Sequence, residues 1–280
     1  MDMNMELLCS TGTLVGRANG YDHTLIVKHH KEIEADGFEL MFVSAFYDKM
    51  HEVARDLMRG DVGVRTIHFE KDITALLGLY GKEERKEGLR RFTKNVQLGE
   101  MLGADKAVYH LWDGRFSPEQ IGRGIALLET LYEIADRHGM ELLVENIPSR
   151  VPSPYENVET VAARYPDACF TFDTRHAHVM GQIETFFASP LWHDRISHLH
   201  VSDYTGETVP GLWGVTRPIL HPGEGVIDFD ALFDAMPPCV ADTVTLESPV
   251  VAPDGSVDIP RLNRTLRYLT RKLFCEKSFS

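Results

Sequence analysis

Long hydrophobic runs are missing from this sequence. Nowhere do about 18 apolar residues follow one another, which is the length a membrane-spanning helix needs. The amino-terminal stretch MDMNMELLCS also lacks the basic region and the long apolar segment of a secretory signal. We therefore expect a soluble, cytoplasmic protein that has no membrane partner.

Paired cysteines and an excess of positive charge are missing as well. The four cysteines, Cys9, Cys169, Cys239 and Cys275, form no CxxC pair, which argues against a disulfide framework or a structural zinc knuckle. Acidic residues outnumber basic ones by 42 to 29, so the formal net charge is -13. Because nucleic-acid phosphates repel a net anion, this balance makes a nucleic-acid partner unfavourable, although it leaves room for a local basic groove.

Linkers, low-complexity tracts and solenoid-type repeats are also absent, so we expect one domain over residues 1–280. Short runs rich in Val, Ile, Leu and Phe alternate with segments of helical period, which is typical of a parallel sheet with crossover helices. Eight runs have this character: 6–10, 38–43, 63–69, 106–111, 141–146, 169–173, 196–201 and 243–248. The expected helices cover 22–35, 49–59, 83–102, 118–138, 158–164 and 260–272, and Ser117 before Pro118 gives one of them a capping hydroxyl and a suitable first residue.

Eight such units in 280 residues predict an α/β fold of the (β/α)8 TIM-barrel type, with a doubly wound open sheet as the alternative. We assign ligand-type side chains to the ends of seven predicted strands: Glu39, His68, His110, Glu145, Asp173, His200 and Glu247. In a barrel these ends meet at one mouth. Any one of them alone is explained by an ordinary hydrogen bond, but several buried carboxylates together need a cation or a proton. Oxygen and imidazole donors without thiolate suit Zn, Mn, Co or Fe better than Ca.

Four segments carry a resemblance to a known family. They are LLVEN with Glu145, FDTRHAH with Asp173 and His176, HLHVSD with His200 and Asp203, and TLES with Glu247. The segment HPGEGVIDF at 221–229 also resembles the family's turn after the seventh strand. Together they resemble the xylose isomerase-like barrels, a group that includes ketose 3-epimerases, hydroxypyruvate isomerases, inosose dehydratases and barrel-type apurinic endonucleases.

The resemblance to the epimerase branch implies one divalent metal held by Glu145, Asp173, His200 and Glu247. It also implies that Glu145 and Glu247 are catalytic and exchange protons with the carbons beside a carbonyl, while His176 binds a substrate hydroxyl. A positioned base and a cation near the developing oxyanion are what such a proton transfer requires. We therefore expect a metal-dependent sugar or polyol isomerase or epimerase that acts on a sugar, polyol or keto-acid.

The resemblance to the endonuclease branch implies a different use of His68 and His110, which would otherwise face substrate. There, histidines at these strand ends bind a second zinc that shares the strand-five glutamate, and a third zinc takes an Asp-x-His pair before GEG. In this chain Arg217 and Ile219 stand at that pair, so the third site is incomplete unless His221 or His198 replaces it. A multinuclear zinc phosphodiesterase is thus the second hypothesis, and a non-catalytic sugar-binding barrel is the third.

The remaining candidates lie around this site. Gly206 stands where ketose epimerases carry a substrate-binding arginine, and Arg217 is the replacement we expect, on a long loop (203–225) that also carries Tyr204 and Trp213 and covers the mouth. Its cation suits a hydroxyl, a carboxylate or a phosphate. Three residues have an expected supporting place: His198 lies one layer below His200, Asp203 either orients His200 or accepts loop amides, and Glu39 touches substrate or is a buried structural acid. We expect a solvated loop position for His178, a solvated helix face at 82–91, and room for a homo-oligomer.

Overall fold

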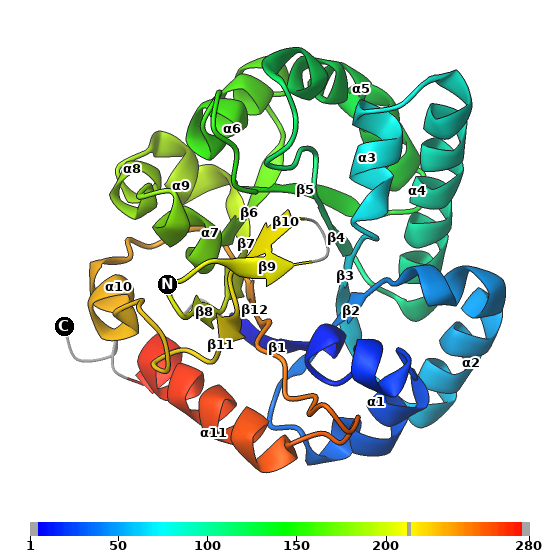
Figure 1. Ribbon diagram of the computed structural model, residues 1–280, viewed down its shortest axis with the longest axis vertical. Helices are drawn as coiled ribbons and strands as arrows, with labels where there is room; N and C mark the ends of the chain where they lie inside the picture. The colour runs from blue at the N-terminus through cyan, green and yellow to red at the C-terminus, as the bar shows by residue number, and fades with distance from the viewer. Residues whose placement is uncertain (1–4, 212–213, 276–280) are drawn as a thin grey trace.

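Eight parallel strands close into a barrel in the computed structural model, which describes residues 5–211 and 214–275 (Figure 1). Each strand pairs with the next one along the barrel, and the last pairs with the first, which closes the sheet. The prediction of a (β/α)8 TIM barrel is confirmed. The strands are β1 (Glu6–Ser10), β2 (Gly37–Met41), β3 (Val64–His68), β4 (Lys106–Tyr109), β5 (Glu141–Glu145), β6 (Cys169–Asp173), β7 (Ile196–Val201) and β12 (Thr243–Leu246).

Helices form the outer ring of the barrel in Figure 1. Those predicted from the sequence are α1 (Thr24–His29), α2 (Met50–Gly60), α4 (Lys82–Leu102), α5 (Pro118–Asp136), α6 (Pro154–Arg164) and α11 (Ile259–Thr270). Five further helices were not predicted: α3 (Asp72–Gly78), α7 (Thr174–Val179), α8 (Ile183–Phe187), α9 (Pro190–Arg195) and α10 (Phe229–Ala235). These are short, and two turns or fewer give too little periodicity to read. None of the helices among the described residues is long and apolar enough to cross a membrane.

The predicted start of α5 is confirmed in atomic detail. The Ser117 hydroxyl accepts a hydrogen bond from the Gln120 amide, and the Gln120 side chain accepts one from the Ser117 amide, with Pro118 in the first turn. The same reciprocal arrangement starts α6, with Ser153 and Glu156. These caps satisfy amides that have no partner within the helix.

The interior of the barrel is polar in this protein. His198 and His200 on β7 both contact Glu39 on β2, a strand that does not neighbour β7, so these side chains point into the barrel. By alternation along the strand, Leu199 and Val201 face outward and pack in the apolar layer under the helices. Hydrogen bonds offset part of the cost of burying polar groups, and here they join Glu39, His198 and His200 across the barrel interior.

The segment after β7 forms two small antiparallel pairs in place of an irregular loop. β8 (Asp203–Tyr204) pairs with β11 (Ile219–Leu220), and β9 (Val209–Gly211) pairs with β10 (Gly214–Thr216). In Figure 1 the β9–β10 hairpin projects over the barrel. Trp213, named in the sequence analysis, lies outside the described residues.

Gly225 is needed for close backbone approach at the base of this segment. A Cβ at Gly225 would lie 2.2 Å from the Tyr204 carbonyl oxygen and 2.4 Å from Asp203 Oδ1. We expect Gly225→Ala to lower the free energy of unfolding by roughly 1–3 kcal/mol through this overpacking. Gly122 in α5 is the control, because a Cβ there meets nothing within 4 Å; Gly122→Ala should raise stability by about 0.5–1 kcal/mol. Denaturant unfolding measures both, and equal effects at the two positions would contradict the packing argument.

Candidate metal centre

Four ligand-type side chains meet at the carboxyl ends of β5, β6, β7 and β12. One donor atom from each of Glu145, Asp173, His200 and Glu247 lies within 4.8 Å of one from each of the others. His200 Nδ1 is 3.2 Å from Glu145 Oε1 and 3.5 Å from Glu247 Oε2. Four strand ends that are far apart in the sequence therefore form one buried group.

Asp173 is held in this group by its neighbours. Its backbone amide donates to Asn146 Oδ1, and Asn146 Nδ2 donates to its carbonyl, so the residue after Glu145 fixes the strand end that carries Asp173. Asp173 Oδ1 accepts the His176 amide at 2.6 Å and caps α7. Asp173 Oδ2 is buried without a hydrogen-bond partner among the described residues. One oxygen is thus used to shape the chain, and the other is left for a ligand.

The ionisation of the group reflects burial and mutual charge. Burial raises the pKa of Asp173 to about 7, helped by the nearby carboxylates and opposed by Arg175. Burial also acts to raise the pKa of Glu145, but His110 and His200 hold that pKa well below its usual range. Burial acts to lower the pKa of His200, but Glu247, Glu39 and Glu145 raise it well above the ordinary value. Without a metal ion, a protonated His200 therefore supplies the positive charge beside these carboxylates.

His68 and His110 form a second group with the other oxygen of Glu145. Their Nε2 atoms are 3.1 Å apart, and they lie 3.5 and 2.7 Å, respectively, from Glu145 Oε2. His68 Nδ1 contacts the Phe69 carbonyl at 2.9 Å, which places its proton on Nδ1 and a lone pair on Nε2. Burial lowers the pKa of His110 to about 4, against the pull of Glu145, so the ring is neutral. A single proton on His110 Nε2 or a metal ion can occupy the space between these three atoms.

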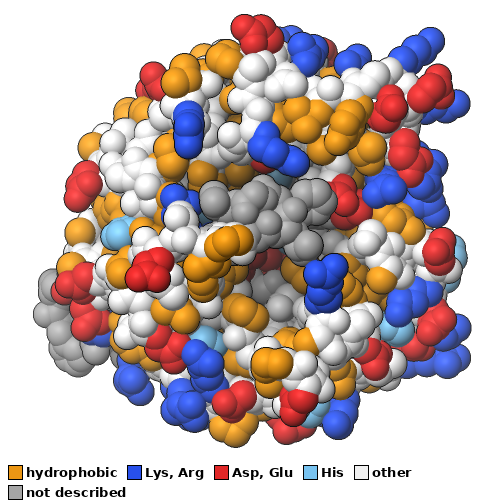
Figure 2. All heavy atoms as spheres, viewed as in Figure 1, with side chains coloured by type: hydrophobic (Ala, Val, Ile, Leu, Met, Phe, Trp, Pro, Cys, Tyr) orange, Lys and Arg blue, Asp and Glu red, His pale blue; other side chains and the backbone are white. Residues whose placement is uncertain are grey.

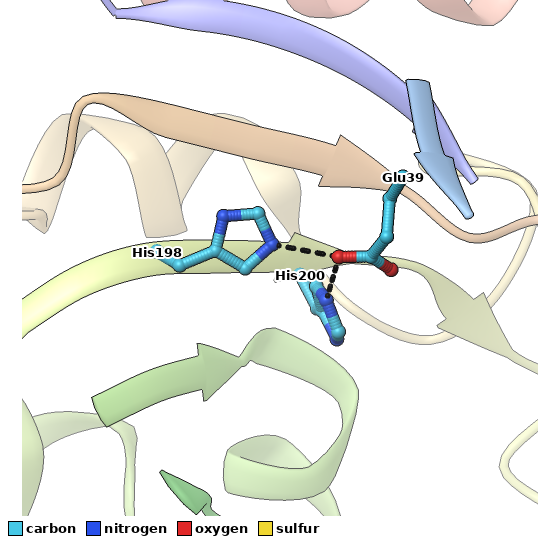
Figure 3. A group of neighbouring side chains, drawn as sticks. All are labelled: Glu39, His198 and His200. Carbon is cyan, nitrogen blue, oxygen red and sulfur yellow. Dashed lines mark hydrogen bonds and ion pairs between the residues drawn. The ribbon is translucent and has the colours of Figure 1, made fainter. Parts of the chain in front are cut away.

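The place of Glu39 differs from the one first expected. β2 continues to Met41, so Glu39 lies two residues inside the strand and is fully buried, one layer below the mouth. Its Oε2 contacts His198 Nε2 and His200 Nε2, each at 3.1 Å, as Figure 3 shows. Of the two roles left open by the sequence, substrate contact and buried acid, this position fits the buried acid. His198 is buried and hydrogen-bonded one layer below His200, where the alternation placed it.

Arg175 joins the site, although the sequence analysis did not single it out. Its Nη2 donates to His176 Nε2 at 3.1 Å, its Nε donates to Ser202 Oγ at 3.1 Å, and it lies 3.8 Å from Asp173 Oδ2. Because His176 Nε2 accepts this hydrogen bond, the ring proton belongs on Nδ1, which is buried and lacks a hydrogen-bond partner among the described residues. His176 is therefore arranged as a hydrogen-bond donor. The signal was available in FDTRHAH, where a cation stands between the acid and the histidine.

Three other candidate residues, Asp203, Arg217 and His178, lie in or against the long segment that follows β7. Asp203 accepts the amides of Tyr204, Gly225 and Ile227, so its hydrogen bonds go to the loop, and Glu39 is the residue that contacts the distal nitrogen of His200. Arg217 follows β10, is half-buried and makes no ion pair with a described residue. His178 is half-buried in α7 and bonds to the Tyr204 hydroxyl at 3.0 Å, so the expectation of a solvated loop residue was wrong.

The distances between donor atoms in the group of Glu145, Asp173, His200 and Glu247 fit a divalent metal. Zn²⁺ would bind nitrogen and oxygen ligands at about 2.0–2.2 Å, so two neighbouring ligands of one ion would lie roughly 3 Å apart, close to the spacing of His200 Nδ1 from its two carboxylates. The partnerless Asp173 Oδ2 and the oxygen and nitrogen donor set fit the same ion. His221, considered as a replacement ligand, bonds to Thr265 Oγ1 at 2.7 Å, and His198 bonds to Glu39 and Thr243. Neither joins His176 in a metal-type group within residues 5–211 and 214–275.

The surface around the barrel opening is not uniformly acidic. Figure 2 shows Lys and Arg side chains around the hollow at the centre of this face. Asp and Glu side chains lie on the same face, so charges of both signs are present there.

This closed parallel barrel carries its carboxylate and imidazole group at the carboxyl ends of the strands, where TIM-barrel enzymes have their active sites. The chain belongs to the xylose isomerase-like TIM barrel family, whose model matches residues 27–260. A comparison with curated proteins by sequence finds no match.

Solved structures share this fold at low sequence identity. The IOLI protein with a binding zinc atom is 19% identical, with a TM-score of 0.68, over 99% of this chain and 100% of that one. A D-tagatose 3-epimerase-like protein is 18% identical, with a TM-score of 0.69, over 96% and 98%. D-allulose 3-epimerase from Methylomonas sp. is 12% identical, with a TM-score of 0.69, over 96% and 98%.

Proposed function

We propose that this protein is a divalent-metal-dependent sugar or polyol isomerase, most specifically an epimerase. The observation that carries the proposal is the convergence of Glu145, Asp173, His200 and Glu247 at one buried centre, with Asp173 Oδ2 left without a partner. The fold neighbours described as D-tagatose 3-epimerase-like and as D-allulose 3-epimerase support a sugar substrate, and the zinc-bound neighbour supports a metal.

Glu145 and Glu247 are suited to proton transfer. Because His110 and His200 hold the pKa of Glu145 well below its usual range, its carboxylate is ionised, which is the form that a general base and a metal ligand both need. Glu247, with its side chain 18% exposed, is the more open of the two carboxylates and would exchange the proton on the other face. A divalent ion held by the four side chains would supply a positive charge for the negative oxygens of the enediolate.

Hydroxyl recognition falls to His176 and Arg217. With its Nε2 occupied by Arg175, His176 presents Nδ1–H as a donor, which suits a substrate hydroxyl or carbonyl oxygen better than a metal. Arg217 is the cation of the long segment that follows β7, and it would contact the far end of the substrate. Conversion of a panel of ketoses, polyols and keto-acids by the metal-loaded protein tests the proposal; binding without conversion across that panel would instead indicate a sugar-binding barrel.

A multinuclear zinc phosphodiesterase is the second candidate. It is favoured by one observation, the approach of His68 and His110 to Glu145 Oε2. Against it stand the donor arrangement of His176 and the incomplete pair at Arg217 and Ile219. The short distance of 2.7 Å between His110 Nε2 and Glu145 Oε2 also suits a shared proton, so this approach alone does not require a metal.

Metal counting separates the two candidates. We expect about one divalent metal per chain in protein purified without chelator, because the first group offers four ligand-type side chains and the second group only three, one of which it shares with the first. His110→Ala should leave this content unchanged, as should His138→Ala, a control at a half-buried histidine far from the centre that bonds to Glu100. Two or three zinc ions per chain, lost in part in His110→Ala and accompanied by cleavage of an abasic-site duplex, would favour the phosphodiesterase.

A further inference from the structure

Glu39 is a carboxylate buried at 0% exposure, and its Oε2 is surrounded by three polar atoms. His198 Nε2 and His200 Nε2 each lie 3.1 Å from Oε2, and Figure 3 draws both contacts. Thr66 Oγ1 also donates to Oε2, at 3.1 Å. A buried charge is costly unless donors compensate it, so these contacts are what allow Glu39 to remain inside the barrel. The position of the group, directly below the candidate metal centre, raises the question of what it does there.

His200 links the two layers through its two ring nitrogens. Nδ1 faces Glu145 Oε1 at 3.2 Å and Glu247 Oε2 at 3.5 Å, while Nε2 faces Glu39 Oε2 at 3.1 Å. A neutral imidazole carries one proton, and a carboxylate oxygen can only accept. When Nδ1 serves as a ligand, the ring proton must lie on Nε2. Nε2–H then donates a hydrogen bond to Glu39 Oε2.

His198 and Thr66 hold Glu39 and do not reach the metal-type group. His198 Nδ1 contacts Thr243 Oγ1 at 2.7 Å, and Thr245 Oγ1 lies 3.3 Å from His198 Nε2, so the ring is fixed on both sides. Although Glu39, His198 and His200 have donor atoms within 4.8 Å of one another, these hydrogen bonds already engage them. Glu39 Oε1 is buried without a hydrogen-bond partner among the described residues, but Oε2 and both imidazole rings are engaged, so the geometry describes a support beneath the centre.

We infer that Glu39 is a positioning residue that fixes the ring and the tautomer of His200, so that the Nδ1 lone pair points at the metal position, and that His198 holds Glu39 in place. The inference rests on the proposed metal centre. Carboxylates that hold a ligating histidine in this way typically change metal affinity by about 10–100-fold when they are replaced.

Glu39→Gln is the direct test. The amide keeps the size of the side chain but offers one acceptor and one donor group, so the His200 ring is free to place its proton on Nδ1. We expect the affinity for Zn²⁺ and for Co²⁺ to fall by about 10–100-fold, measured by competition with a chromophoric chelator. His198→Gln should weaken affinity less, because it leaves the contact between Glu39 and His200 in place.

Glu70→Gln provides the matched control. Glu70 is another buried acid, it follows β3, and it bonds to Tyr47 and Arg91 rather than to the metal-type groups. Its substitution should lower stability without changing metal affinity. Equal affinity in wild type and Glu39→Gln, or a similar loss in Glu70→Gln, would overturn the inference while leaving the proposed function intact.

A measurement on the wild-type protein tests the inference without relying on whether the variants fold. Nitrogen NMR of histidine-labelled protein with Zn²⁺ should show His200 protonated at Nε2 and bound through Nδ1. Binding through Nε2 would overturn the inference. Failure of the wild type to bind either Zn²⁺ or Co²⁺ would instead reject the metal centre itself, which is a different result.

Discussion

Glu145→Gln and Glu247→Gln are each expected to lower kcat for epimerisation by roughly 10²–10⁴-fold, the usual contribution of a general acid or base. Each change replaces an ionisable carboxylate by an amide of the same size, which can still offer an oxygen to a metal but cannot take a proton. The fold should survive, since Glu145 and Glu247 stand at the strand ends and not in the apolar layer.

Metal-saturated conditions and a distant control make this test specific. Both variants are assayed with added Mn²⁺, Co²⁺ or Zn²⁺, so that weaker binding is not mistaken for lost proton transfer. Glu100→Gln changes a carboxylate on α4 that bonds to the half-buried His138, away from the centre, and its kcat should be unchanged. Activity in a double variant that carries both Glu145→Gln and Glu247→Gln would contradict the proposed mechanism.

Removal of the metal is expected to have the second large effect. A ligand present at 100–1,000 times its Kd stabilises a protein by about 2.7–4.1 kcal/mol, and at this size each kcal/mol moves Tm by about 2–4 °C. Chelation should therefore lower Tm by roughly 5–15 °C and abolish turnover, because three carboxylates and His200 would lose their shared cation.

Readdition of single metals completes the experiment. Tm and activity should return together with Mn²⁺, Co²⁺ or Zn²⁺, and the ion that restores the higher kcat identifies the better cofactor. Calorimetry or a dye-based melt measures Tm, and a coupled sugar assay measures turnover. A chelated protein with unchanged Tm and full activity would show that the group at β5, β6, β7 and β12 works without metal.

The centre was largely predictable, because a (β/α)8 barrel carries the carboxyl end of every strand to one mouth. In the structure Glu145 and Asp173 end β5 and β6, His200 lies one residue before the end of β7, and Glu247 follows β12. Their convergence needs only the strand order. Glu39 was wrongly placed at a strand end. The apolar segment that forms β2 was recognised, but how deep Glu39 lies in the barrel depends on where β2 ends and how it pairs with its neighbours.

Arg175 and His176 show a second limit of the sequence. Their neighbourhood in the chain was visible, but the hydrogen bond from Arg175 Nη2 to His176 Nε2 depends on α7, a helix of six residues that starts at Thr174. So short a helix has no readable period, and its direction is set by the Asp173 cap.

The amino-acid sequence by itself determined the barrel, the identity of the strands and longer helices, and the chemical types of the side chains at the mouth. These are local properties, because periodicity, caps and strand ends are written in neighbouring residues. Only the tertiary structure decided which atoms meet: the bond from His200 to Glu39 joins residues 161 positions apart, and Oδ2 of Asp173 is left without a partner among the described residues. The physical reason is that donor and acceptor pairing across the barrel interior depends on closure and strand register, which no single segment specifies.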